Sequence, residues 1–285
     1  MNDERANIQR ILFVIKFGGD LVDRPKIGIA LSAGAARGFA HLGVLKVLQE
    51  ANIPVDYIAG SSMGSFIGAL YSNGLDLEMV KHLAVHLKRK HWVDVTLPGL
   101  GFITGDKMQA LTRLLTHHKN LEDLPIPLAV VTTDLLNGEK IVFQTGPVAD
   151  AVRASISVPG VFEPVPYKDR LLVDGGVADR LPISVVRDMG ADFIIAVDVL
   201  SKSHEVQVKN IFDVITQAIT IMERQILAQQ ELTADFLVLP EVGDIAPTAF
   251  HRVEECIRRG ERAIRPNLAE LQDKLANWQG ENKDE

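Results

Sequence analysis

Short apolar runs alternate with amphipathic segments along most of the chain. The runs at 26–31, 55–59, 128–134 and 192–199 are rich in Ile, Val, Leu and Ala, which is typical of strands buried on both faces. Segments with apolar side chains at helical spacing follow them. The predicted helices cover 39–50, 75–90, 106–118, 148–155, 181–189, 208–230 and 250–275, with further strands at 140–144, 170–173 and 236–239. This alternation predicts an α/β fold, a mainly parallel sheet with helices on both faces.

The same pattern predicts one folded domain at 26–278, with an extension at 1–25 before it and a charged tail at 279–285 after it. The extension contains an apolar run, 11–17, for which docking on the core and weak interfacial anchoring are the two interpretations. The apolar stripe on 208–230 is interpreted as core packing, with a dimer or membrane face as the alternative use.

Composition narrows the function classes. The net charge of −7 argues against nucleic acid as a partner and against electrostatic capture by anionic lipid. The single cysteine, Cys256, excludes an internal disulfide and fits a reducing compartment. We therefore expect a cytoplasmic protein and leave open a transient contact with the inner face of the membrane. The sequence does not determine the oligomeric state.

A nucleophile elbow is the most specific motif of the chain. The run 55–59 leads into Gly60-Ser61-Ser62-Met63-Gly64, and a helical run, 65–70, follows. G-x-S-x-G between a strand and a helix places the serine, here Ser62, at the apex of a strained turn, and Gly60 and Gly64 leave room for the backbone. The positive end of the helix would face the serine oxygen. A small-residue turn without chemistry is the alternative.

A second small-residue loop, Ser32-Ala33-Gly34-Ala35-Ala36-Arg37-Gly38, joins the first predicted strand to the helix at 39–50. Such a loop can present backbone N–H groups to an anion. It lacks the G-x-G-x-x-G of a dinucleotide site and the G-K-[ST] of a phosphate loop. An oxyanion hole, with N–H groups near Gly34 and Ala35, is the favoured interpretation. For Arg37 we favour orienting the loop over binding an anionic head group.

Asp174 is the favoured base for the serine, because a hydroxyl nucleophile needs one. It follows the predicted strand 170–173, and Gly175 and Gly176 let the chain turn sharply there. A carboxylate serves this role if burial raises its pKa or if it binds the hydroxyl directly. An ordinary tight turn is the alternative for this D-G-G sequence.

The histidines are weaker candidates. His204 and His251 are the only ones after Asp174, and neither lies in a glycine-flanked turn after a strand. His41 lies on the helix at 39–50, where holding helix to sheet is the more natural role. His82 and His86 are four residues apart but lack the H-E-x-x-H form and a third ligand, so we predict no metal and no cofactor.

Together these motifs resemble the patatin-like phospholipase family, in particular its bacterial members similar to neuropathy target esterase. The resemblance covers roughly 26–199. It rests on the loop with Phe39-Ala40-His41-Leu42-Gly43-Val44-Leu45, on G-S-S-M-G, on D-G-G and on Arg153-Ala154-Ser155-Ile156-Ser157-Val158-Pro159 with Phe162 and Pro164.

The resemblance implies that 26–278 is a patatin-like catalytic domain with a Ser–Asp dyad. Ser62 would be the nucleophile, Asp174 the base and the loop through Gly34, Ala35, Ala36, Arg37 and Gly38 the oxyanion hole. It also implies hydrolysis of fatty-acyl esters in phospholipids or lysophospholipids through an acyl-enzyme. The rival hypotheses are a lipid-binding or regulatory protein that keeps the fold, and a histidine-dependent hydrolase. One departure is visible: Ser32, Ala33 and Ala35 stand where family glycines are common. Their amides still donate if the backbone does not require φ > 0.

Overall fold

The computed structural model describes residues 24–86, 93–95, 99–200, 208–228 and 233–279. The apolar run 11–17 and His204 lie outside these ranges, as do almost all of the extension and of the charged tail. None of the helices in the described ranges is long and apolar enough to cross a membrane.

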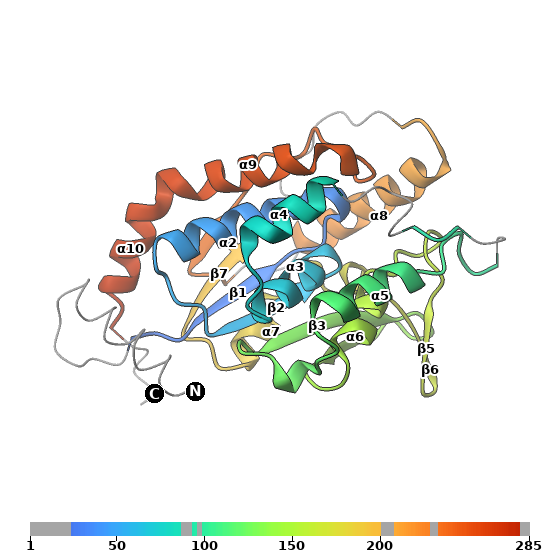
Figure 1. The fold of residues 1–285 in the computed structure, drawn as a ribbon, viewed down its shortest axis with the longest axis horizontal. Coiled ribbons are helices and arrows are strands. Elements are labelled where there is room, and N and C mark those ends of the chain that lie inside the picture. Colours follow the sequence, from blue (N-terminus) through green and yellow to red (C-terminus); the bar gives the residue numbers. More distant parts are fainter. Residues whose placement is uncertain (1–23, 87–92, 96–98, 201–207, 229–232, 280–285) are drawn as a thin grey trace.

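One sheet organises the described residues (Figure 1). Its strands are β1 (Ile27–Leu31), β2 (Tyr57–Ser61), β3 (Leu128–Asp134), β4 (Lys140–Phe143), β5 (Val165–Tyr167), β6 (Arg170–Asp174), β7 (Phe193–Val197) and β8 (Phe236–Val238). The order is β5-β6-β3-β2-β1-β7-β8, and β4 pairs with β3. Five neighbouring strands are mutually parallel: β3, β2, β1, β7 and β8. The other three, β4, β5 and β6, are antiparallel to the strands they pair with.

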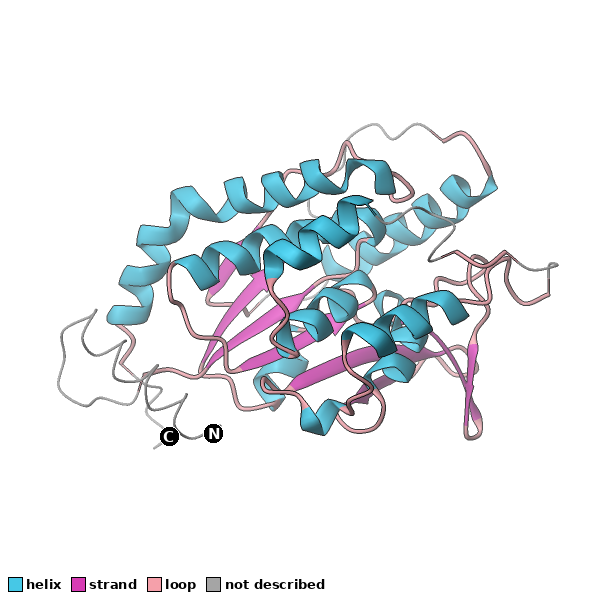
Figure 2. Cartoon of the chain, in the orientation of Figure 1, coloured by secondary structure: helices cyan, strands magenta, loops and turns pink. Residues whose placement is uncertain are grey.

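Helices cover both faces of this sheet, as Figure 2 shows, which confirms the predicted fold class. They are α2 (Ala40–Glu50), α3 (Met63–Ser72), α4 (Leu77–His86), α5 (Asp106–Leu115), α6 (Val148–Ser155), α7 (Ile183–Asp188), α8 (Ile211–Ala228), α9 (Val253–Ile264) and α10 (Leu268–Ala276). Alternate strand residues divide between the faces: Ile29 and Ile58 pack toward α2 and α3, whereas Ala30 and Ala59 pack toward α7.

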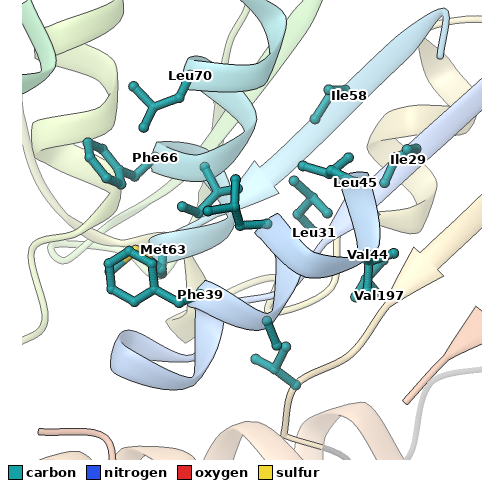
Figure 3. Packing of buried hydrophobic residues seen from close by; sticks show 14 of the residues in the cluster. Ile29, Leu31, Phe39, Val44, Leu45, Ile58, Met63, Phe66, Leu70 and Val197 are labelled. Atoms are coloured by element: carbon teal, nitrogen blue, oxygen red, sulfur yellow. The ribbon is translucent and has the colours of Figure 1, made fainter. Parts of the chain in front are cut away.

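The larger core lies between β1, β2 and the helices α2 and α3 (Figure 3). Leu31, Leu45 and Ile58 are fully buried there. Phe39 and Met63 stand at the beginnings of α2 and α3, and Phe66 continues the same apolar surface along α3. The ends of β1 and β2 are thus fixed by burial just where the two small-residue loops begin.

The structure differs from the predicted elements in two places. The single terminal helix at 250–275 is two helices, α9 and α10, separated by a 3₁₀ turn at Arg265–Asn267. Pro266 accounts for the break, since proline has no N–H for the helical ladder and clashes with the preceding turn. Strand β5, which pairs with β6, was not among the predicted strands.

Candidate active site

Ser62 and Asp174 are brought together by strand register. Strand β2 pairs with β3 in parallel as far as Ser61 opposite Val131. Strand β6 runs the other way and ends with Asp174 opposite Thr132, the next residue of β3. The C-terminal ends of β2 and β6 therefore meet at consecutive positions of β3, although they are far apart in the sequence.

Ser62 occupies a strained backbone conformation at this junction. It follows β2 directly, acts as the N-cap residue of α3, and has φ 53° and ψ −123°. A non-glycine residue with positive φ stores roughly 1 to 3 kcal/mol, which the surrounding structure must supply. The Ser62 N–H donates to Ser155 Oγ at 2.9 Å, and the Ser62 carbonyl accepts from Ser65 Oγ at 2.6 Å. These bonds hold the apex in place.

The side chains of Ser62 and Asp174 are in direct contact. Ser62 Oγ donates to Asp174 Oδ2 at 2.5 Å, and the side chains are buried, with 6% and 4% exposed. Burial raises the pKa of Asp174 to about 6, partly offset by hydrogen bonds from the Ser62 hydroxyl and the Gly176 N–H. At neutral pH the carboxyl is mostly ionised, yet it accepts a proton more readily than an exposed aspartate does.

Further hydrogen bonds fix the position of Asp174. Its N–H donates to Ser157 O at 2.9 Å, its carbonyl accepts from Thr133 Oγ1 at 2.9 Å, and its Oδ1 accepts from Gly176 N at 2.8 Å. Ser155 links the two halves, since its hydroxyl accepts from Ser62 N and donates to Val131 O at 2.6 Å. Sequence reasoning noted the segment containing Ser155 and Ser157 but gave neither residue a role.

The motif glycines stand where chain segments approach closely. A Cβ on Gly64 would lie 2.3 Å from Leu31 O, so α3 begins directly against the end of β1. Gly60 likewise faces the backbone of the elbow helix. A Cβ on Gly175 would lie 2.2 Å from Val131 O, and one on Gly176 would lie 2.4 Å from Glu223 Oε1. Larger residues at 64 or 175 would push backbone against backbone.

The small-residue loop lies beside Ser62, but only some of its amides are free. Ala36 N donates to Pro247 O at 3.0 Å and Arg37 N donates to Gly34 O at 3.0 Å, so these two N–H groups are already used. Gly34 N and Ala35 N have no acceptor among the described residues. Gly38 lies inside the 3₁₀ turn Ala35–Phe39. The residues able to present N–H groups to an oxyanion thus narrow to Gly34 and Ala35.

The backbone at Ala35 has a positive φ of 46°, although an alanine was expected to fit this loop only where a positive φ is not required. The left-handed region costs a residue with a Cβ roughly 1 to 2 kcal/mol. The loop therefore has a conformation that a glycine would adopt at lower cost. Hydrogen bonds from the loop to residues 243–247 hold the alanine in this conformation.

The side chain of Arg37 provides two of the hydrogen bonds that fix the loop. Its side chain is fully buried, and Nε and Nη2 donate to the carbonyls of Ile245 and Gly243 at 2.6 and 3.2 Å. Burial lowers its pKa to about 10, which leaves it charged at neutral pH. These contacts agree with the loop-orienting role that the sequence favoured over binding a head group.

No histidine among the described residues hydrogen-bonds Ser62. His41 is buried on α2, and its Nε2 donates to Ser32 O at 2.8 Å. Burial lowers the pKa of His41 to about 4, so the ring is neutral and joins helix to sheet. His82 and His86 stack on the exposed face of α4. Over the described ranges no three His, Cys, Asp or Glu side chains are grouped as a metal site requires.

Two cavities meet at Ser62. The first, the apolar cavity, has a volume of about 870 Å³ and lies among α3, α4, α5 and α9. Apart from Ser62, its walls are apolar side chains such as Phe66, Leu70, Met108 and Leu111. The second, named the polar cavity for the two carboxyl groups in its wall, has a volume of about 420 Å³, lies under α8 and is otherwise lined mostly by apolar residues. Gly34, Asp174 and Glu223 line it, and Ser62, Ala35 and Val158 line both cavities.

Comparison with known proteins identifies the family of the chain that carries this site. A model of the patatin-like phospholipase family matches residues 29–187, which include both small-residue loops and the D-G-G turn. The chain belongs to the patatin-like phospholipase family. An uncharacterised NTE family protein of Mycobacterium tuberculosis is 39% identical over 176 residues, which are 61% of this chain and 49% of that protein. The patatin-like chain therefore spans about half the length of that relative.

Other relatives share the same region. Patatin-like phospholipase domain-containing protein 6 of Homo sapiens is 37% identical over 184 residues, 62% of this chain and 13% of that protein. A lysophospholipase of Aspergillus fumigatus is 36% identical over 179 residues, 61% of this chain and 12% of that protein.

Solved structures agree on the fold of the patatin-like chain. VipD from Legionella pneumophila gives a TM-score of 0.61 at 15% identity, covering 89% of this chain and 68% of that one. Human group IVD cytosolic phospholipase A2 gives a TM-score of 0.51 at 13% identity, covering 96% and 63%. At these identities the likeness is one of fold.

Proposed function

We propose that this protein is a serine hydrolase of fatty-acyl esters, in which Ser62 is the nucleophile and Asp174 its base. The observation that carries the proposal is the 2.5 Å hydrogen bond from Ser62 Oγ to Asp174 Oδ2, at a strained elbow where a large apolar cavity opens. Family membership supports it, since the matched region contains both residues.

The geometry supports a two-step reaction. Asp174 takes the hydroxyl proton as Ser62 Oγ attacks the ester carbonyl, and the amides of Gly34 and Ala35 bind the oxyanion that forms. The tetrahedral intermediate then breaks the bond to the alcohol, which leaves with the proton held by Asp174. A water molecule attacks the acyl-Ser62, again giving a proton to Asp174, and the fatty acid departs as Ser62 regains its hydrogen.

The apolar cavity is the proposed site for the acyl chain. Its lining is made of apolar side chains and provides no polar partner except Ser62. A hydrocarbon chain is the ligand that gains most from such walls, at roughly 0.8 kcal/mol per buried methylene. The relatives named as phospholipases and a lysophospholipase favour phospholipids or lysophospholipids as the source of that chain.

Hydrolysis of p-nitrophenyl butyrate and palmitate by wild type and Ser62→Ala tests the proposal. We expect Ser62→Ala to lose at least roughly a thousandfold in kcat, because no acyl-enzyme can form. Ser72→Ala is the matched control: it removes a buried serine hydroxyl from the same helix, one without a hydrogen-bond partner in the described residues. It should keep wild-type rates. A folded wild type that binds the lipid but turns over no ester would instead favour a lipid-binding protein.

A further inference from the structure

The polar and apolar sides of α8 are the reverse of what a surface helix normally shows. Its polar residues Asp213, Thr220 and Glu223 are buried, with 6%, 5% and 7% exposed. Five large apolar residues are instead 43–56% exposed, and they form what we call the apolar face of α8: Ile211, Val214, Ile221, Met222 and Ile226. A surface helix usually turns its apolar stripe to the core, so an exposed one marks a surface that contacts something else.

The apolar face carries no charge. The other exposed positions described on the helix are Ala218 and Gln225. The charged residues of α8 lie elsewhere on it, since Asp213 and Glu223 are buried and Arg224 is half-buried. Although the whole chain has a net charge of −7, this face therefore presents no carboxylate that would repel the phosphate groups of a lipid.

The exposed apolar surface extends beyond α8 to the segment 99–103. Phe102 of this segment and Phe212 of α8 meet edge to face, with ring centroids 5.4 Å apart. The same segment carries Leu100, which is 68% exposed. It lies at the same end of the molecule as the beginning of α8 (Figure 1). Two segments that are far apart in the sequence thus present exposed apolar side chains next to each other.

This surface borders the two cavities that meet at Ser62. The two phenylalanine rings pack in one cluster with Val158 and Phe162, both of which line the apolar cavity. On the opposite side of α8, Thr216 and Glu223 line the polar cavity. The helix therefore stands between the catalytic site and whatever its apolar face contacts.

We propose that the apolar face of α8, together with Leu100, docks the protein on the surface of a phospholipid bilayer. The choice of a lipid surface rests on the proposed ester hydrolysis, because long-chain acyl esters reside in bilayers. The docked helix lies in the plane of the interface, with its apolar side among the acyl chains and its polar side toward Ser62. Docking then places the cavities next to the lipid that supplies the substrate.

A second copy of the chain is the principal alternative occupant of this surface. A second copy seated on α8 and Leu100 would cover the segment that borders the cavities and would hinder the approach of a lipid to Ser62. A bilayer covers the same side chains and delivers the substrate there. The observations therefore favour the lipid surface, and self-association is an outcome that the test can detect.

Flotation of the full chain with vesicles of dioleoyl phosphatidylcholine tests the proposal. Ser62→Ala serves as the parent chain, so that binding is measured without turnover, and we expect it to float with the vesicles. Ile221→Gln with Met222→Gln should lower its partition coefficient by roughly tenfold or more, because two apolar side chains no longer gain from burial. Adding phosphatidylserine should not strengthen binding, because the contact is apolar and the chain is acidic.

Two further variants make the flotation result specific. Ile211→Gln with Val214→Gln changes the first part of the apolar face and should weaken binding to a similar extent, so the test does not depend on one variant folding. Leu114→Gln is the matched control, because this leucine is 68% exposed on α5. Its end of α5 is hydrogen-bonded to the end of α3 opposite Ser62. This control should bind as the parent does.

A fluorophore on the apolar face locates the contact directly. Cys256 is the only cysteine and is fully buried, so Met222→Cys provides one exposed thiol for an environment-sensitive label. Its emission should shift to the blue when phosphatidylcholine vesicles are added, because the label enters the acyl region. The same label on Leu114→Cys should keep its emission. No shift for labelled Met222→Cys would overturn the inference.

Hydrolysis distinguishes failure of this inference from failure of the proposed function. With Ser62 present, Ile221→Gln with Met222→Gln should hydrolyse dissolved p-nitrophenyl butyrate within about twofold of wild type, and p-nitrophenyl palmitate held in the vesicles roughly tenfold more slowly. Flotation that the substitutions leave unchanged would overturn the docking surface while leaving ester hydrolysis standing. So would a wild type that does not float, whether it is monomeric or a dimer that the substitutions dissociate in sedimentation velocity. A chain that floats through this face but turns over no ester would overturn the proposed function alone.

Discussion

The two cavities that meet at Ser62 differ in volume and in the charge of their walls. The apolar cavity is the larger, lies among four helices and presents hydrocarbon walls. The polar cavity is about half that volume, lies under α8 and places Glu223 beside Asp174. The apolar walls are part of the ordinary core, so they stabilise the fold as they form a pocket. The polar cavity also has apolar walls, such as Leu200 and Ile219, but it encloses two carboxyl groups, and carboxyl groups out of water raise the free energy of the folded state.

This difference indicates which part of the site is maintained for chemistry. A buried carboxyl pair, a strained serine and an alanine at positive φ are three costs concentrated at one junction. Folded proteins retain such costs where function requires them, and a neutral or relaxed substitute would make the molecule more stable.

Loss of the base should have the largest effect, because Asp174 is proposed to take the proton from Ser62, where the two cavities meet. We expect Asp174→Asn to lower kcat for p-nitrophenyl butyrate roughly a hundred- to ten-thousandfold, with little change in KM. The amide keeps the shape of the side chain but cannot accept the serine proton. Steady-state kinetics on the folded variant measure this, and a loss of less than about tenfold would contradict the role of Asp174 as base.

The same substitution should stabilise the protein, which sharpens the contrast between polar and apolar walls. The folded pKa of Asp174, about 6, lies above the unfolded value, so its contribution is fully present at low pH and is lost as the pH rises through 6. Asp174→Asn should therefore gain on the order of 2 to 3 kcal/mol over wild type above pH 6 and little near pH 4.

Urea unfolding of both proteins at a series of pH values checks this. An Asn variant that is less stable than wild type at neutral pH would mean that the hydrogen bonds of Asp174 outweigh the burial of its charge.

Filling the apolar cavity should distinguish its role from that of the polar cavity. Ala84 on α4 lines the apolar cavity and is only half-buried. We expect Ala84→Phe to lower kcat/KM for p-nitrophenyl palmitate by roughly tenfold or more, since a few methylenes lose their burial, while butyrate hydrolysis changes little. Ala276→Phe, on exposed α10, is the control of equal size. An equal loss for both chain lengths would place the acyl chain elsewhere.

Relaxing the oxyanion loop should have the smallest effect. Ala35→Gly removes the cost of φ 46° but adds freedom to the unfolded chain, so we expect a gain in stability of about 1 kcal/mol or less. Ester hydrolysis should stay within about threefold, because the amide remains in place. Thermal unfolding with kinetics measures both. A tenfold loss of rate would show that the alanine side chain itself shapes the site.

Much of this structure follows from the sequence because local rules determine it. Continuous apolar runs give the buried parallel strands, and G-x-S-x-G between strand and helix gives the strained turn at Ser62. The glycine pair after a strand drew attention to Asp174, but that pattern is equally typical of an ordinary tight turn, and the role of Asp174 as base stays a prediction. Pro266 also indicates a break in the terminal helix, although the predicted helix at 250–275 ran through it.

What the sequence could not give depends on contacts between distant segments. The N–H of Ala36 is taken by Pro247, which no local pattern around the loop reveals. Glu223 lies on α8, and the predicted core packing of the apolar stripe on this helix was wrong, because four stripe residues are 43–56% exposed: Ile211, Val214, Met222 and Ile226. The position of Glu223 beside Asp174 depends on contacts between distant segments. The positive φ of Ala35 likewise becomes evident only when the loop is seen held between its neighbours.

The most direct test of the central claim is covalent labelling with a long-chain alkyl fluorophosphonate, followed by mass mapping of the modified peptide. We expect one adduct per chain, on Ser62, that forms at least a hundredfold or so more slowly in Asp174→Asn. Ser72→Ala, the matched serine on the same helix, should label as wild type does. An adduct on another residue, or labelling of Ser62 at an unchanged rate without Asp174, would contradict the Ser62–Asp174 mechanism.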